Sequence, residues 1–385
     1  MRRLGLALLL LAPSAVPARA MTADQEKLVQ SGLDDLYNSD YDGADRVFAE
    51  ARRKAPDDPV AALGAAISAW WRMENDFASP GSAEQKAFKA AVKRSIDVGE
   101  KAARGKDEAL ADLCLGASFG LRGRAEAAQR HWFSAYLAGR KAYKYGQKAV
   151  KLDPQEYDAY LGLGAFDYYV ATLSRFVRAL AFTSGGGKDK GLAELQLAAD
   201  RGRFSPVAAK LLLVSIDWTF EKEPQDAWKL LDELHGRYPE SPFIDSMRLI
   251  GLYHLRDAAE LQRQARAYLE KAQRGAPNFR PIDRTVGRYF LGLGEQLAGD
   301  PLAALKDYQT ALVELPPDHR SRTLVHLFVG EASDLLGRRD DAVAAYHAAV
   351  DGPPFWGVAR YARWLLKHPF KPAYDPLPSR NESLD

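Results

Sequence analysis

The sequence predicts an all-α protein, an alpha-alpha superhelix of about seven helix pairs that ends in a C-terminal capping helix. Two observations predict this solenoid. Small residues, an aromatic residue and a proline recur at fixed intervals, and the repeating units follow one another with an almost constant period. With 385 residues, of which 47% are hydrophobic and 27% charged, the chain is long enough to bury a substantial core.

The repeat is clearest in two consecutive units near the C-terminus. The first contains Gly292, Gly299, Ala304, Tyr308, Ala311 and Pro316, and the second repeats these types at the same intervals as Gly330, Gly337, Ala342, Tyr346, Ala349 and Pro354. An N-terminal unit fits the pattern through Gly32, Ala44, Phe48, Ala51 and Pro56. The leading alanines of the last four units are 38 or 39 residues apart, at positions 227, 265, 304 and 342. A steady period of this size is typical of a helical solenoid.

Each residue type in the repeat has a physical role in a pair of antiparallel helices. The first glycine and the first alanine lie where the two helices cross, and only small side chains allow a close approach. The aromatic residue four positions after the alanine fills the space that the small residues leave. Gly299 and Gly337 are expected to end the first helix of their pairs, and the proline ends the second. Between Trp71 and Ala142, long charged runs predict lengthened helices.

This pattern resembles the tetratricopeptide repeat (TPR) family, and more specifically exported bacterial TPR proteins of undefined role. The resemblance covers the chain after residue 20, clearly in three units and loosely in about four, although the period exceeds the family's usual value of about 34 residues. It implies a superhelix in which the first helices of successive pairs form a groove for peptides. Carried over by repeat alignment, that groove includes Tyr37, Tyr160, Phe166, Asp167, Tyr169, Phe220, Tyr289 and Phe328, with Arg175 and Arg178 at its rim. The alternative is that these aromatics are core residues.

The stretch SGGGKDKG, residues 184–191, has two interpretations. It lacks the G-x-x-x-x-G-K-[ST] spacing of a P-loop, because Asp189 follows Lys188. We interpret it as a turn that leads into the second helix of a pair. The alternative is an anion site formed by Gly186, Gly187, Lys188 and Lys190.

The N-terminus predicts export. Residues 1–20 combine Arg2 and Arg3, an apolar run and the small residues Ala18 and Ala20, which together are typical of a cleaved signal peptide. We therefore expect a periplasmic or secreted protein with a helical repeat domain at 21–368 and a disordered or extended tail at 369–385. No later stretch has the length of a membrane span. The net charge of +2 is spread along the chain, which argues against nucleic acid as a partner.

The sequence shows no pattern for catalysis or metal binding. None of the seven histidines forms an H-E-x-x-H motif, and G-x-S-x-G is absent. The single cysteine, Cys114, lies in an apolar run and is expected to be buried. We therefore expect no enzyme activity, no cofactor and no metal. A capping helix is expected in the segment FWGVARYARWLLKHPF.

Two functions follow from these observations. The favoured hypothesis is a non-catalytic exported repeat protein, a scaffold or assembly factor that binds a protein or peptide partner in the cell envelope. The alternative is a binding or transport accessory that holds a small anionic or lipid-like ligand in the irregular middle repeat, between Phe166 and Lys190.

Overall fold

The computed structural model describes residues 22–75, 82–105, 108–129, 131–172, 187–353, 355, 357–373 and 375–376. All regular elements in these ranges are helices, which confirms the all-α prediction. Several predictions fall outside the described residues: the signal peptide, most of the tail, and the site residues Arg175, Arg178 and Gly186.

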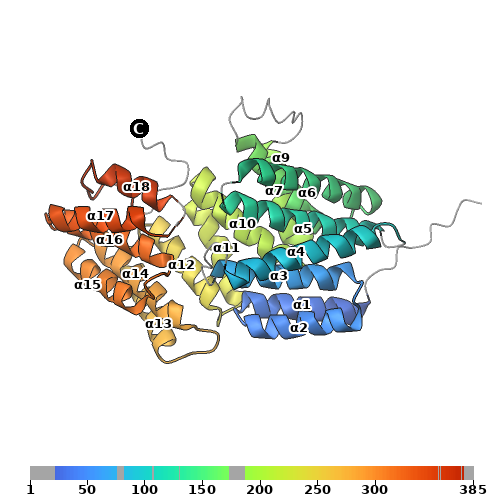
Figure 1. The fold of residues 1–385 in the computed structure, drawn as a ribbon, viewed down its shortest axis with the longest axis horizontal. Helices are drawn as coiled ribbons and strands as arrows, with labels where there is room; N and C mark the ends of the chain where they lie inside the picture. The colour runs from blue at the N-terminus through green and yellow to red at the C-terminus, as the bar shows by residue number, and fades with distance from the viewer. Residues whose placement is uncertain are drawn as a thin grey trace, which may run out of the picture.

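The described helices form eight antiparallel pairs, close to the predicted number, and one final helix (Figure 1). The first four pairs are α1 (Ala23–Tyr37) with α2 (Tyr41–Lys54), α3 (Pro59–Asn75) with α4 (Ala83–Ala102), α5 (Glu108–Ala128) with α6 (Trp132–Leu152), and α7 (Ala159–Thr172) with α9 (Lys188–Arg201). The helices α4, α5 and α6 have 20, 21 and 21 residues, which confirms the lengthened helices expected in this region.

The fifth pair contains a π-helical turn, and the later pairs are regular. The remaining elements are α10 (Pro206–Ile216), the π-helix η1 (Asp217–Glu221), α11 (Pro224–Arg237), α12 (Pro242–His254), α13 (Ala258–Gln273), α14 (Pro281–Leu297), α15 (Pro301–Glu314), α16 (Ser321–Leu335), α17 (Arg339–Asp351) and α18 (Val358–Leu365). Each of the last pairs packs on the next, so that the solenoid grows along the chain (Figure 1).

The repeat glycines provide space for the aromatic residues, as predicted. A Cβ atom on Gly330 would lie 2.3 Å from Cε1 of Tyr346, and a Cβ atom on Gly32 would lie 2.6 Å from Cζ of Phe48. Both rings are buried. A side chain at either glycine would therefore overlap a ring that has no free space, so the glycine and the aromatic residue depend on one another.

The turns within the last regular pairs have the predicted conformation. Gly299 has φ +84° and Gly337 has φ +71°, values in the left-handed region that favours glycine. Asp300 then begins α15, because its side chain accepts a hydrogen bond from the backbone N–H of Ala303 at 3.0 Å. These local interactions fix the angle at which the second helix returns along the first.

The N-terminal helices contact helices that lie about 170 to 200 residues later in the chain. The repeat period alone does not predict these contacts. The rings of Trp71 and Phe243 are 4.8 Å apart, edge to face, and those of Tyr37 and Tyr238 are 5.7 Å apart. The Tyr238 hydroxyl donates a hydrogen bond of 2.7 Å to Asp34. The solenoid therefore closes on itself where α1 and α3 contact α11 and α12.

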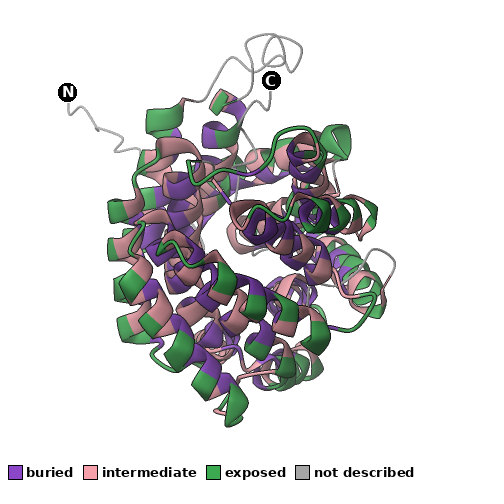
Figure 2. Ribbon diagram, turned by 90° about the vertical axis from the view of Figure 1, so that its left-hand side faces the viewer, coloured by how far each residue is buried: buried purple, intermediate pink, exposed green. Residues whose placement is uncertain are grey.

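One hydrophobic cluster fills this closure. It is formed by α1, α2, α3, α5, α10, α11 and α12, and its buried members are Val29, Leu33, Leu36, Tyr37, Tyr41, Ala44, Phe48, Val60, Cys114, Val207, Leu234, Tyr238 and Ile244. Cys114 is free and buried, as expected. Figure 2 shows the buried residues on the helix faces that meet other helices and the exposed residues at the periphery. The inner face of the N-terminal turn is thus occupied by the chain itself.

The C-terminal end is covered by α18, which confirms the predicted capping helix. Val358, Tyr361 and Leu365 are buried against the core of α14 to α17. The Tyr361 hydroxyl donates to the backbone carbonyl of Asp375 at 3.0 Å, so the described beginning of the tail lies along this cap. α18 therefore packs on both helices of the last repeat, α16 and α17.

Candidate binding groove between α6, α7 and α9

The predicted groove residues do not form one surface. Tyr37 is part of the buried closure, and Phe328 is fully buried with its ring 5.3 Å from that of Tyr308. Tyr289 is half-buried and packs on Phe290 at 4.7 Å. For Tyr37 and Phe328 the structure therefore corrects the groove assignment in favour of the core alternative. The remaining described residues gather around α7 in two groups.

The first group borders a groove between the second helices of consecutive pairs. This groove, with a volume of about 370 Å³, runs between α6 and α9 over the surface of α7. Its lining residues are Tyr143, Gln147, Val150, Lys151, Tyr160, Leu163, Lys190 and Glu194. The structure thus brings together Tyr160 from the predicted peptide groove and Lys190 from the predicted anion site, which the sequence analysis had treated separately.

The start of α7 is held in place by Asp158, and this fixes one end of the groove. One carboxylate oxygen of Asp158 accepts hydrogen bonds from the backbone N–H groups of Phe204 and Ser205, at 2.9 and 2.8 Å. It also accepts one from the Ser205 hydroxyl at 2.8 Å. The buried carboxylate ties the first turn of α7 to the connection between α9 and α10, so Tyr160 has a defined position relative to α9.

An ion pair between the buried Asp167 and the exposed Lys190 forms the wall of the groove on the α9 side. Asp167 is 1% exposed, and its Oδ2 atom accepts a hydrogen bond from the Lys190 ammonium. The Tyr143 hydroxyl lies 3.4 Å from the same oxygen, and Glu194 lies 3.4 Å from the ammonium. Burial favours the neutral amine, but the hydrogen bond to Asp167 and the charge of Glu194 outweigh it, so the pKa of Lys190 lies above its usual value. Lys190 is therefore a fixed cation in this wall.

Glu194 and Tyr143 also respond to this environment. Burial raises the pKa of the Glu194 carboxyl, and the nearby Lys190 only partly offsets that effect. Burial and the charge of Asp167 raise the pKa of the Tyr143 hydroxyl. The tyrosine therefore remains a neutral hydrogen-bond donor near pH 7. The Phe166 ring packs against the Tyr143 ring, with centroids 4.8 Å apart. The sequence analysis did not identify Tyr143 or Glu194. Tyr143 lies one helical turn before Gln147, and Glu194 lies one helical turn after Lys190, so each shares a helix face with another residue of the groove.

The second group lies at the C-terminal end of α7, next to η1. The ring of Phe220 is 5.8 Å from those of Tyr168 and Tyr169. The buried Tyr168 donates its hydroxyl hydrogen to Glu221, and the Lys188 ammonium lies 2.8 Å from that carboxylate. Tyr169 is the exposed member of this cluster.

The predicted anion site has its described lysines in ion pairs. Lys188 pairs with Glu221, and Lys190 pairs with Asp167. Gly187 is the residue that precedes the first turn of α9, with extended backbone angles of φ −157° and ψ 155°. An external anion would have to replace a carboxylate at each lysine. The helix that was expected after the glycines is present as α9, which confirms that part of the interpretation.

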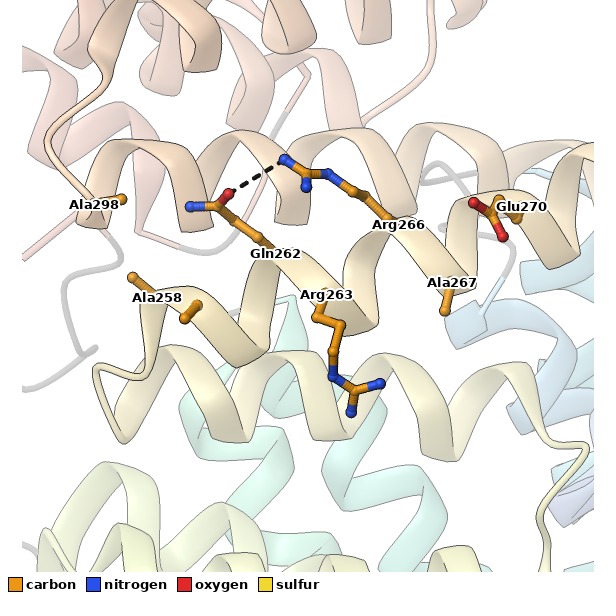
Figure 3. Close-up of a pocket in the computed structure, with 8 residues that line it drawn as sticks. Ala258, Gln262, Arg263, Arg266, Ala267, Glu270 and Ala298 are labelled. Carbon is orange, nitrogen blue, oxygen red and sulfur yellow. Dashed lines mark hydrogen bonds between the residues drawn. The ribbon is translucent and has the colours of Figure 1, made fainter.

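A second, larger groove lies along α13. It has a volume of about 610 Å³ and is lined by Ala258, Ala259, Gln262, Arg263, Arg266, Ala267, Glu270 and Ala298 (Figure 3). The Arg266 side chain points toward Gln262 and donates a hydrogen bond of 3.3 Å to it. Arg263 pairs with Glu260 on the same helix. No aromatic residue lines this groove, and its two arginines are already engaged by Glu260 and Gln262. We therefore favour the groove beside α7 as the candidate site.

Within the described part of the chain, no group of three or more His, Cys, Asp or Glu residues is arranged to hold a metal ion. The described helices also include none that is both long and apolar enough to cross a membrane.

Comparisons with known proteins gave matches among solved structures only. No protein-family model and no curated protein matches this chain. Yeast Tom70 is similar with 10% identity and a TM-score of 0.44, covering 88% of this chain and 87% of that chain. The Rap protein complexed with competence and sporulation factor is similar with 12% identity and a TM-score of 0.40, covering 88% and 78%. The human IFIT1 dimer with m7Gppp-AAAA is similar with 13% identity and a TM-score of 0.41, covering 90% and 78%.

These similarities carry no inference about a ligand, and the architecture rests on the geometry of the chain itself. Successive helices pair and stack from α1 to α18. The repeat glycines pack against aromatic rings in units at both ends of the solenoid. The chain is therefore a TPR-like helical solenoid.

Proposed function

We propose that this chain is a non-catalytic helical-repeat protein that binds a protein or peptide partner through the groove between α6, α7 and α9. The single observation that supports this most is the combination of an aromatic lining with a fixed ion pair in one groove of about 370 Å³. That volume lies near the lower end of the range of about 300–1,000 Å³ that is typical of concave ligand sites.

The groove offers both apolar and polar side chains to a partner. Tyr143 and Tyr160 provide apolar surface for a side chain of the partner, above the buried Leu163. Gln147 and Lys151 are exposed on the α6 rim, across the groove from Lys190 on α9, and are available for polar contacts with the partner's backbone. Because Asp167 already holds Lys190, the groove presents this charge in a constant place, and binding requires little ordering of the lysine. A short segment with one apolar anchor and neighbouring polar groups fits this chemistry.

We place this activity in the cell envelope. Support comes from the N-terminal sequence, where a basic start, an apolar run and a small-residue cleavage site occur together in residues 1–20. We expect the mature chain to begin at Met21. Mass spectrometry of the N-terminal peptide after expression in a host with an export system tests this, and a retained Met1 in the fractionated envelope would contradict it.

The binding proposal is tested by photo-crosslinking in the native host. A photoreactive residue at Gln147, which is exposed and lines the groove, is expected to capture a specific protein. The same residue at Lys306, exposed on α15, is the control and is expected to capture none above background. The substitution Tyr160→Ala should reduce capture at Gln147 at least tenfold, since it removes an aromatic anchor.

Other outcomes would overturn the proposal. Equal capture at Gln147 and Lys306, or capture that Tyr160→Ala leaves unchanged, would show that the groove is not the binding site. A small molecule that co-purifies in native mass spectrometry and is lost in Tyr160→Ala, without any captured protein, would replace the partner hypothesis by the small-ligand alternative.

A further inference from the structure

The charges of the whole chain nearly balance, but helix α6 carries an excess of positive charge. Between Trp132 and Leu152 the sequence contains five basic residues and no acidic residue. The basic residues are Arg140, Lys141, Lys144, Lys148 and Lys151. The neighbouring α4, of similar length, instead carries Glu84, Asp97 and Glu100 among its lysines. A local excess of positive charge therefore lies within a protein whose overall charge gives no sign of it.

The exposed residues of α6 share one face. Phe133, Leu137, Arg140, Lys144, Lys148 and Lys151 follow one another at intervals of three or four residues, which is the spacing of a single helix face. Every one of them is exposed. The face extends over about 27 Å, at a rise of about 1.5 Å per residue. It is apolar at its N-terminal end and basic along the rest.

The apolar end is unusually exposed for a folded protein. Trp132 is 63% exposed, Phe133 is 75% exposed and Leu137 is 44% exposed, all within the first two turns of α6. Other exposed apolar residues, such as Leu302 and Val313, lie on α15, which carries charges of both signs. A cluster of large apolar side chains beside a basic stripe indicates an interaction surface rather than isolated exposure.

Few carboxylates lie close enough to neutralise the positive charge of α6. Asp112 is fully buried, and its Oδ2 atom is 3.7 Å from the Lys148 ammonium. Glu126 pairs with His131, just before the helix begins. Lys141 and Arg140 lie over the rings of Phe119 and Tyr136, and these contacts keep their charge. The stripe therefore presents a positive potential to solvent.

We infer that the exposed face of α6, from Trp132 to Lys151, docks on an anionic lipid bilayer. An anionic bilayer complements both parts of the face at once. Its phosphate groups attract the basic residues, and its headgroup–acyl boundary accommodates Trp132, Phe133 and Leu137. A nucleic acid would match the charge but would leave Leu137 without an apolar environment. Such docking is peripheral. The docking face adjoins the groove and shares Lys151 with it, whereas Tyr143 and Val150 line the groove only.

Vesicle flotation of the full mature chain, residues 21–385, tests this inference. Vesicles of equal parts phosphatidylcholine and phosphatidylglycerol are compared with vesicles of phosphatidylcholine alone. We expect the protein to float only with the anionic vesicles and to be released by high salt. Circular dichroism of each variant verifies that its helical content is unchanged.

Two variants remove the two parts of the face separately. The double substitution Arg140→Gln with Lys144→Gln is expected to weaken binding about 30-fold, since each basic residue near a membrane surface contributes roughly fivefold. Phe133→Ser with Leu137→Ser is expected to weaken it more than tenfold. The matched controls Lys86→Gln with Lys89→Gln on α4, and Leu302→Ser with Val313→Ser on α15, are expected to bind like the natural sequence.

Several results would overturn the inference. These are no flotation with anionic vesicles, an equal loss in the matched controls, or variants of α6 that float normally. Binding of a labelled single-stranded oligonucleotide that is lost in the α6 variants, without vesicle binding, would assign the face to nucleic acid instead. The groove variant Tyr160→Ala should float normally, which separates this surface from the proposed partner site.

Discussion

The two ends of the solenoid use the same repeat packing but differ in what covers their inner helices. In the C-terminal region, α12 to α18 stack one pair on the next, and α18 covers the last pair. In the N-terminal region, α1 and α3 additionally contact α11 and α12. The inner face of the first turn is therefore filled by a later part of the same chain. A shared repeat predicts how neighbouring helices pack, but it does not predict whether the resulting groove stays open.

The difference is explained by the residues on the first helices. Trp71 and Tyr37 are large aromatic residues that project toward Phe243 and Tyr238. Asp34 adds a hydrogen bond to Tyr238 and an ion pair with Arg237 at 3.2 Å. These contacts bury an aromatic cluster between distant repeats.

The largest effect is expected at the repeat glycines. Gly330→Val should lower the free energy of unfolding by about 3 kcal/mol or more, because its side chain would overlap the buried Tyr346 ring. Gly32→Val should have an effect of similar size through Phe48. Urea unfolding followed by circular dichroism measures both. Equal losses would show that the regular and the closed regions depend on the same packing.

A glycine without such a neighbour provides the control. Gly162 lies on the exposed side of α7, and a Cβ atom there would meet nothing within 4 Å. Gly162→Ala should increase stability by about 0.5 to 1 kcal/mol, through lower backbone entropy in the unfolded chain. A loss at Gly162 equal to that at Gly330 would mean that helix propensity, rather than contact with the aromatic ring, determines these positions.

The closure is tested by a double-mutant cycle between Trp71→Ala and Phe243→Ala. Each substitution should lower stability by about 3 kcal/mol. Their effects should be coupled by about 1 kcal/mol, since the two rings contact each other. Small-angle scattering of the double variant should show a larger radius of gyration, because the ends of the first turn separate.

The matched cycle pairs Trp71→Ala with Trp364→Ala on α18, far from the closure along the chain. These two effects should add to within about 0.5 kcal/mol. Coupling of the same size in both cycles would contradict a specific contact between α3 and α12, and an unchanged radius of gyration would show that the closure does not depend on this aromatic pair.

The smallest expected effect is a change of stability with pH that arises from Glu295, in the C-terminal region. Burial and the neighbouring Asp307 raise the pKa of Glu295 from its ordinary value of 4.5 to about 7. The folded protein therefore holds this proton more tightly than the unfolded chain. The stabilisation is complete below about pH 4.5 and is lost as the pH rises through 7. Since Glu295 is only half-buried, solvent screening leaves an effect on the order of 1 kcal/mol or less.

Glu295→Gln tests this effect, because the amide is neutral at every pH. We expect the variant to have a higher melting temperature than the natural protein at pH 8 and the same one at pH 5. Glu270→Gln, at an exposed position on α13, should show no such difference. A natural protein that grows more stable from pH 5 to pH 8, in a manner that Glu295→Gln abolishes, would reverse the predicted sign.

The sequence allowed more of the fold than of the site to be predicted. Glycine, alanine and proline act on their immediate neighbours, so the pairing of α14 with α15 and the capping helix followed from spacing. The assignment of Tyr37 and Phe328 to a groove was wrong because an aromatic residue on a helix has the same spacing whether a later helix covers it or not. Asp167 and Lys190 were predicted separately, and their ion pair depends on the crossing of α7 and α9.

By itself the sequence determined an all-helical repeat, its period, the ends of the last helices and the burial of Cys114, because these depend on residues a few positions apart. Only the tertiary structure decided that the first turn closes on α11 and α12, that a groove forms beside α7, and that the basic face of α6 is exposed. These features depend on how the small rotations between successive pairs add up over many repeats, and no local pattern in the sequence records that sum.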